Sequence, residues 1–207
     1  WADPTCYVVI TLDHEGNEIW QRDFGPFTGN HGVGTSPIVY EDMLIVGKDE
    51  DESSSLFAVD RRTGKDRWAT RRESDKTAYS TPCLLELDGA QPQLIFCSMA
   101  HGISSVDAGT GKTNWDIPVF DKRTVSSPVL AGDIIFGSCG SGAGGNFVVA
   151  VKAANPLSSA EPEEVYRVDK SAPYVPTTLV INDLAFLWSD GGVVTCIDAS
   201  NGDVVWR

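Results

Sequence analysis

The 207-residue sequence lacks the short motifs by which most enzymes can be recognised. It contains no G-x-S-x-G elbow, no H-E-x-x-H pair and no Walker loop, and its three histidines are far apart. None of its five cysteines forms a C-x-x-C motif, and no two of them are adjacent. The sequence therefore gives no sign of the common hydrolase, zinc or nucleotide-binding sites.

Positive charge and long apolar runs are also scarce. Sixteen Lys and Arg residues face 29 Asp and Glu residues, which gives a net charge of −13 and a pI near 4.5. This balance argues against nucleic acid and anionic membrane surfaces as partners. No apolar run approaches the roughly 18 residues of a membrane-spanning helix. We expect neither a nucleic-acid partner nor a membrane span in this chain.

The odd number of cysteines and their scattered positions predict free, buried thiols rather than a disulfide framework. One pairing stays open, because Cys83 and Cys97 flank a hairpin expected at Asp88-Gly89. The cysteines therefore do not reveal the redox compartment.

What the sequence has instead is a repeated phrase. Leu56–Trp68 returns as Ile103–Trp115 and as Val194–Trp206, and a weaker copy runs from Ile10 to Trp20. The Asp of the phrase recurs 47 residues on, at positions 13, 60 and 107, and then 91 residues later at 198. The longer gap requires a worn copy, which lies at 149–152 and 165–167 on either side of an insertion. A Ser/Thr-Pro pair keeps the same phase, at Ser36-Pro37, Thr81-Pro82, Ser127-Pro128 and, eroded, Thr177-Thr178.

Each repeat divides into four short apolar segments, which in the first complete copy are residues 35–40, 43–47, 56–60 and 66–69. Four strands in a period of this length predict an all-β propeller of four-stranded antiparallel blades. We expect one propeller segment over 1–207, with blades at 33–70, 78–117, 124–168 (degenerate, with the insertion) and 175–207, and a half blade at 7–23. Because the sequence starts at Trp1 rather than Met, we expect a piece of a seven- or eight-bladed ring. A four-bladed ring with a spare hairpin is the alternative.

Every residue of the phrase has a structural interpretation. The Asp60 carboxylate accepts backbone N–H groups of the hairpin, and Gly64 takes the positive φ that closes it. Ala58 leaves room for a ring, and Trp68 packs against a neighbouring blade with its indole N–H on a backbone carbonyl. The same docking roles are expected for Trp20, Asp107, Gly111, Trp115, Asp198, Gly202 and Trp206.

The pattern Ala-x-Asp-x-x-Thr-Gly-Lys-x-x-Trp at 58–68 resembles the tryptophan-docking repeat of the pyrroloquinoline quinone-type β-propellers, and the resemblance covers residues 7–207. It implies export to the periplasm or cell surface. That superfamily includes quinoprotein alcohol dehydrogenases and the outer-membrane assembly lipoprotein of the β-barrel insertion machinery. The chain is most similar to the non-enzymatic members. We therefore expect a scaffold without a cofactor, and the alternative is a fragment of a quinone-dependent dehydrogenase.

The enzyme alternative implies pyrroloquinoline quinone, Ca²⁺, a vicinal Cys pair above the cofactor and a Trp beneath it. No vicinal pair is present, and Trp188 is the candidate platform. The acidic run 49–52 has the alternating spacing of a calcium loop, but we expect a solvated acidic loop. The glycine-rich stretch 140–145 leads into a strand rather than a helix, so we expect a flexible loop and no phosphate site.

One pattern departs from pure scaffolding. His31, Lys76 and Lys122 each lie six residues before the proline of a Ser/Thr-Pro pair, and Arg123 and Tyr79 lie close by. These positions precede the innermost strand of each blade, where the funnel of the ring opens. Arg71, Arg72 and Lys170 are expected on the same connectors. We predict a cationic mouth that binds a protein or a small anionic ligand. Ordinary solvated connectors are the alternative.

Overall fold

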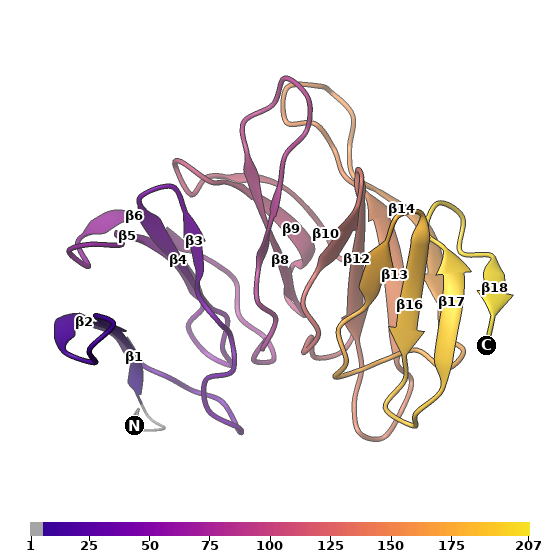
Figure 1. Ribbon diagram of the computed structural model, residues 1–207, viewed down its shortest axis with the longest axis horizontal. Helices are drawn as coiled ribbons and strands as arrows, with labels where there is room; N and C mark the ends of the chain where they lie inside the picture. Colours follow the sequence, from indigo (N-terminus) through magenta and orange to yellow (C-terminus); the bar gives the residue numbers. More distant parts are fainter. Residues whose placement is uncertain (1–5) are drawn as a thin grey trace.

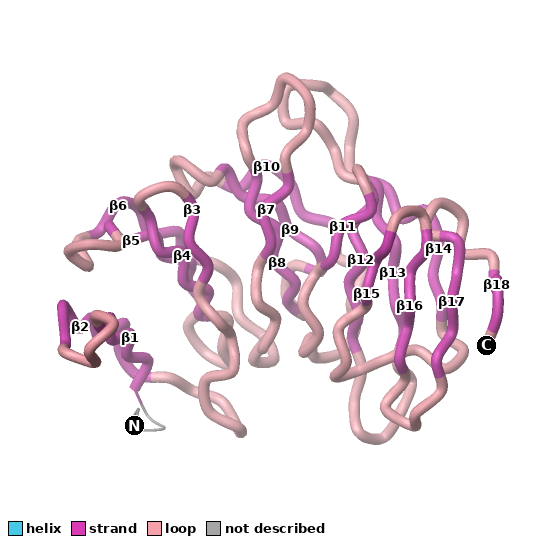
Figure 2. The backbone as a smooth tube through the Cα atoms, in the orientation of Figure 1, coloured by secondary structure: helices cyan, strands magenta, loops and turns pink. Residues whose placement is uncertain are grey.

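The computed structural model describes residues 6–207, and every regular element within them is a β-strand (Figures 1 and 2). The strands form one antiparallel hairpin and four antiparallel four-stranded sheets. The hairpin consists of β1 (Cys6–Leu12) and β2 (Glu18–Pro26). The first sheet consists of β3 (Ile38–Tyr40), β4 (Met43–Lys48), β5 (Ser55–Asp60) and β6 (Asp66–Arg71). The second consists of β7 (Cys83–Leu85), β8 (Gln93–Ser98), β9 (Gly102–Asp107) and β10 (Thr113–Ile117). The third consists of β11 (Val129–Ala131), β12 (Ile134–Cys139), β13 (Phe147–Lys152) and β14 (Glu163–Val168). The fourth consists of β15 (Leu179–Ile181), β16 (Leu184–Trp188), β17 (Val194–Asp198) and β18 (Val204–Trp206).

The sheets follow one another as the blades of a partial propeller, and the β1–β2 hairpin and the last blade lie on opposite sides of the arc in Figure 1. In each sheet the strands pair in chain order, and the first strands of the last two blades, β11 and β15, lie against each other. The predicted all-β fold with four-stranded antiparallel blades is confirmed. No strand crosses between blades, so each blade contacts mainly its neighbours.

The innermost strand of the first complete blade covers 38–40 rather than the predicted 35–40, because the Ser/Thr-Pro pair bonds across to the next blade instead. The Ser36 N–H donates to Thr81 Oγ1 at 3.1 Å, and the Thr81 N–H donates to Ser127 Oγ at 3.1 Å. The Ser127 N–H donates to Thr177 Oγ1 at 3.2 Å, so the eroded copy keeps its hydroxyl function. These bonds link successive blades at the start of their inner strands.

Aromatic residues of the outer strands link the same blades at the opposite edge. The indole N–H groups donate to carbonyls of the next blade, Trp20 to Arg61, Trp68 to Ala108 and Trp115 to Ala154, at 3.0, 3.1 and 3.1 Å. In the worn copy the Tyr166 hydroxyl donates to the Ala199 carbonyl at 2.7 Å. Trp206, in contrast, is half-exposed, and its ring lies tilted by 56° to that of Phe186 in its own blade, with the centroids 6.1 Å apart.

The hairpin glycines have a second role that the sequence did not reveal. Gly64 has φ of +68°, as its turn requires, and the Asp60 carboxylate accepts the N–H groups of Arg62 and Thr63 at 3.0 Å. A Cβ built on Gly64 would lie 2.8 Å from the Trp20 ring of the preceding blade. Gly111 and Gly202 are covered in the same way, by the rings of Trp68 and Tyr166. The glycine therefore closes the turn and receives the ring.

Cys83, Cys97, Cys139 and Cys196 are free thiols. Cys97, Cys139 and Cys196 are buried, while Cys6 and Cys83 are half-buried. Cys83 lies opposite Ile95 rather than Cys97, so the open pairing is not formed. Burial raises the pKa of the Cys83 thiol to about 12. The described residues form no helix that could span a membrane.

Candidate ligand-binding mouth

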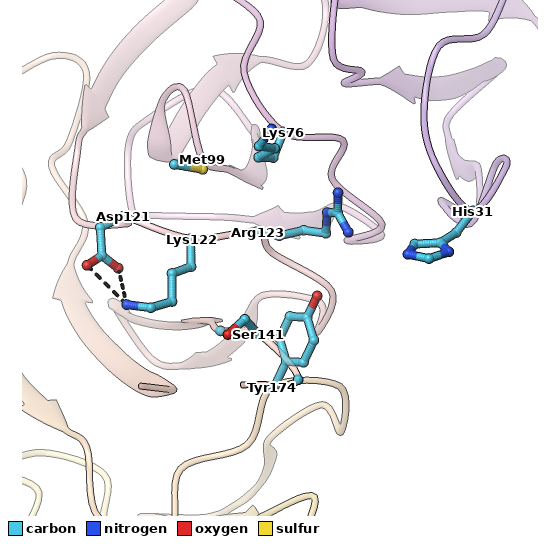
Figure 3. Close-up of a pocket in the computed structure, with 10 residues that line it drawn as sticks. His31, Lys76, Met99, Asp121, Lys122, Arg123, Ser141 and Tyr174 are labelled. Carbon is cyan, nitrogen blue, oxygen red and sulfur yellow. Dashed lines mark hydrogen bonds and ion pairs between the residues drawn. The ribbon is translucent and has the colours of Figure 1, made fainter. Parts of the chain in front are cut away.

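Four inter-blade connectors meet around an open cavity of about 450 Å³ at one mouth of the arc. One connector brings His31, the next brings Lys76, the third brings Asp121 to Arg123 and the fourth brings Tyr174 (Figure 3). The turns that follow β8 and β12 complete the wall with Met99, Gly140, Ser141 and Gly142. The cavity is therefore built from residues of all four connectors.

Four of the five predicted mouth residues line this cavity, namely His31, Lys76, Lys122 and Arg123. The fifth, Tyr79, lines an adjoining cavity of about 340 Å³ together with His31, Gly34, Val125, Tyr174 and Val175. His31 and Tyr174 belong to both cavities. The structure thus brings the predicted set into one region.

The three cations of the mouth differ in the contacts that their side chains make within the protein. Lys122 Nζ bonds Asp121 at 3.0 Å, and Figure 3 shows its side chain turned toward that carboxylate. Arg123 lies over the Tyr79 ring, with the guanidinium carbon 5.8 Å from the ring centroid. Within residues 6–207 neither Lys76 nor Arg123 forms a hydrogen bond or ion pair through its side chain, and Arg123 Nε is buried without a partner. The mouth therefore holds two cations that form no side-chain hydrogen bond or ion pair within the described residues.

The expectation of a solvated acidic loop at 49–52 is wrong. Lys48, Asp49 and Glu50 are buried, and only Glu52 is fully exposed. Glu50 Oε1 accepts a bond from Lys48 Nζ at 2.8 Å, and Glu50 Oε2 accepts the Thr28 N–H at 2.7 Å. A buried carboxylate must be paired to offset its lost hydration, and these two partners supply the pairing.

The neighbouring Asp51 carboxylate holds the second connector in place. Its Oδ1 accepts both the N–H and the hydroxyl of Thr77 at 2.7 Å. Partial burial opposes ionisation, but the bonds from Thr77 and the charges of Lys76 and Arg123 together lower the pKa of Asp51. Asp51 therefore positions the residue next to Lys76, a role that the sequence analysis missed.

Asp190 does the same for the fourth connector. Its two carboxylate oxygens accept the N–H groups of Tyr174 and Val175 at 2.7 and 3.1 Å. Like the acidic run, Asp190 follows the second strand of its blade. An acid at that place in the repeat was the signal in the sequence that could have identified these positioning residues.

Arg72 was expected on the connectors of the mouth, but its side chain lies elsewhere. Its side chain is only 4% exposed, lies 3.5 Å from the Asp49 carboxylate and donates to the hydroxyls of Ser98 and Ser104. The guanidinium also lies over the Phe96 ring, 5.5 Å from its centroid. Arg72 is thus an internal partner between two blades.

The ligand set that the resemblance implies for quinone and Ca²⁺ does not fit the residues present. No group of three His, Cys, Asp or Glu side chains in residues 6–207 is arranged to hold a metal ion. Trp188 is 59% exposed at the end of β16 and does not line the mouth cavity. The glycine-rich stretch forms a turn before β13, in which the Ser141 N–H donates to Asn146 Oδ1 at 3.0 Å. We derive no redox step for this chain.

Comparison with known proteins identifies the repeat. Residues 7–207 match the family model described as outer membrane protein assembly factor BamB. No curated protein matches the sequence. Among solved structures, BamB from Moraxella catarrhalis superposes with a TM-score of 0.66 at 15% identity, over 96% of this chain and 57% of that one. The chain thus spans little more than half the length of that structure.

Enzymes share the same fold. A europium-containing methanol dehydrogenase superposes with a TM-score of 0.60 at 13% identity, over 87% of this chain and 42% of the enzyme. The quinohemoprotein alcohol dehydrogenase from Comamonas testosteroni superposes with a TM-score of 0.61 at 14% identity, over 86% of this chain and 35% of the enzyme. Identities this low establish the propeller fold alone.

Proposed function

The chain belongs to the family of the outer membrane protein assembly factor BamB, and on that basis we propose that it is a non-enzymatic propeller scaffold that binds a protein partner at its mouth. The observation that carries this proposal is the cavity of about 450 Å³ to which four connectors contribute. Three carboxylates hold those connectors in place, because each accepts a backbone N–H group from one of them: Glu50, Asp51 and Asp190.

The charge of the mouth supports the same proposal. The chain carries −13 overall, yet its mouth brings Lys76, Lys122 and Arg123 together. Asp121 also lines the cavity and pairs with Lys122, so the wall keeps an excess of positive charge. Such an excess attracts groups of the opposite sign and raises the association rate. From the family description we further propose that the protein acts in the periplasm or at the cell surface of a bacterium and takes part there in the assembly of envelope proteins.

The test is partner capture with the full-length protein. Wild type and the triple variant Lys76→Ala, Lys122→Ala and Arg123→Ala are cross-linked in envelope extracts, and bound proteins are identified by mass spectrometry. We expect at least one partner that the wild type captures and the variant loses. If both proteins capture the same partners equally, the mouth is not the binding site.

A second candidate function is a fragment of a quinone-dependent dehydrogenase, which is favoured by the two enzymes of the same fold. It is tested by titrating the full-length protein with pyrroloquinoline quinone and Ca²⁺ while following thermal stability and dye-coupled alcohol oxidation. A ligand at about 100 times its Kd stabilises a protein by roughly 2.7 kcal/mol. A shift of that size with turnover would support the enzyme, and no shift would leave the scaffold.

A further inference from the structure

The mouth contains two adjoining cavities of different chemistry that share a wall. One holds Lys76 and Arg123, whose side chains form no hydrogen bond or ion pair within residues 6–207, and the other is mainly apolar. His31 and Tyr174 line both cavities, so a ligand in one lies directly beside the other. Building on the proposed function, we propose that the mouth recognises a partner segment in which an acidic side chain lies next to an apolar one.

Arg123 is the residue best suited to the carboxylate. Its backbone is held by a β-bridge to Gly140, in which the Gly140 N–H donates to the Arg123 carbonyl at 3.0 Å. Its guanidinium is held against the Tyr79 ring, yet within the described residues none of its nitrogens has a hydrogen-bond partner. A planar guanidinium matches a carboxylate through two parallel N–H···O bonds. An anchored Arg with no partner of its own is therefore a preformed carboxylate receptor.

The surrounding groups reinforce this choice. Neither of two acids near the mouth bonds Arg123: Asp121 bonds Lys122, and Asp51 accepts its bonds from Thr77 and interacts with Lys76 and Arg123 through its charge alone. Figure 3 shows the Tyr174 hydroxyl directed toward the Arg123 side chain, where it can donate a further bond to a bound carboxylate. Lys76 adds a second positive charge to the same cavity.

The second cavity determines which side chain of the partner segment lies next to its acidic one. Its walls come from the Tyr79 ring, Tyr174, Gly34, Val125 and Val175, and His31 is its one titratable side chain besides the tyrosines. At about 340 Å³ it has room for one large aliphatic or aromatic side chain. Val175 is 53% exposed, so a ligand that covered it would remove apolar surface from water.

The occupant we infer is a protein segment rather than a free anion. A free phosphate or small carboxylate would fill the basic cavity and leave its apolar neighbour unused. A polyanion such as nucleic acid would approach a chain of net charge −13 and be repelled. One or two carboxylates beside an apolar side chain satisfy both cavities with little such repulsion.

The experiment is selection of a random nine-residue peptide library on the immobilised full-length protein. Enriched peptides are then titrated against four variants by fluorescence anisotropy. Arg123→Gln removes the charged guanidinium, Arg123→Lys keeps the positive charge but not the paired donors, and Val175→Ser removes an apolar side chain from the wall of the second cavity. Lys152→Gln removes a cation of the third blade that is paired with Asp133 and lies outside both cavities. Circular dichroism melts confirm that each variant is folded.

We expect enrichment of an acidic residue next to an apolar one. Affinity should fall about ten- to a hundredfold in Arg123→Gln and recover in part in Arg123→Lys, since a charged bidentate pair is lost and then partly replaced. It should fall about fivefold in Val175→Ser, stay unchanged in Lys152→Gln, and weaken as salt rises. Competition by glutarate or inorganic phosphate should be weak.

Two results would overturn the inference, and they differ in what they mean for the proposed function. Enriched peptides without an acidic residue, lost in Val175→Ser but not in Arg123→Gln, would keep the mouth as the binding site and remove the carboxylate. Peptides that bind all variants equally, or no enrichment, would count against the mouth itself.

Discussion

The docking rim and the mouth use the same repeat in opposite ways. The docking rim, meaning the Asp–Gly hairpins and the aromatic rings that cover them, makes the same contact at three junctions: a ring over the next hairpin and a bond to its carbonyl. At the junction with the third blade, whose hairpin lacks the Asp and Gly, Trp115 keeps the bond, to the Ala154 carbonyl. At the mouth, the equivalent connector positions six residues before Pro37, Pro82, Pro128 and Thr178 carry His31, Lys76, Lys122 and Ala172. Contacts that repeat from blade to blade hold the ring together, whereas connector positions whose residues differ from blade to blade are available for recognition.

The contrast has a physical basis. A ring over a hairpin is stabilised by burial and by one backbone bond, so any blade can dock on any other through the same geometry. Recognition of a partner needs particular charges at particular places, and these differ from one connector to the next. The two regions meet only through the blade sheets, so each can be changed separately.

The largest expected effect comes from the docking rim. Trp68→Ala removes a buried ring and leaves the Ala108 carbonyl without its indole donor, and it should cost about 3–5 kcal/mol of unfolding free energy. Trp188→Ala is the matched control, because that ring is 59% exposed and makes no docking contact, and we expect less than about 0.5 kcal/mol. Urea unfolding followed by circular dichroism measures both. Equal losses would show that Trp68 is not a docking residue.

A smaller effect separates the two roles of the hairpin glycine. Gly111 and Gly132 both have positive φ, at +73° and +62°, so alanine strains the backbone at each. Only at Gly111 would the added Cβ also strike a ring, that of Trp68, whereas Gly132 faces open space. Gly111→Ala should therefore lose about 1–3 kcal/mol more than Gly132→Ala in the same unfolding assay. If the two losses are alike, the turn alone accounts for the glycine.

The smallest effect belongs to the mouth and depends on pH. The pKa of Asp51 is lowered in the folded protein, so its stabilising contribution is present above the unfolded pKa of about 3.9 and is lost as pH falls through the native pKa. Asp51→Asn should lower the free energy of unfolding at neutral pH by on the order of 1 kcal/mol, and this gap should shrink as the pH falls below the unfolded pKa and through the native one. Glu52→Gln, an exposed neighbour, should show no gap at any pH. A gap for Asp51→Asn that does not change with pH would contradict this assignment.

The sequence predicted the fold well because the signals of a propeller blade are local. The turn chemistry of Asp60 and Gly64 and the spacing of Trp68 depend on neighbours a few residues away, and the structure has the blade strands they indicate. The first strand of the first complete blade was predicted too long. Ser36 bonds across to the next blade, and no local pattern reports such a contact.

The site was only partly predictable. The spacing of His31, Lys76 and Lys122 from their prolines found residues that do line one cavity. The same reasoning failed for Arg72, which has similar placement in sequence but is buried beside Asp49. It also failed for the acidic run, because a cluster of charges is usually solvated and only the packing of two blades shows that this one is enclosed.

By itself, the sequence determined the repeat and the blade architecture, since these follow from turns and strand alternation within one repeat. Only the tertiary structure decided which cations share a cavity and which acids hold the connectors. It also decided that the Arg123 side chain is held against a ring while its buried Nε has no hydrogen-bond partner within the described residues. The reason is distance along the chain. The mouth is assembled from connectors roughly one repeat apart, and their relative positions depend on how successive twisted blades pack.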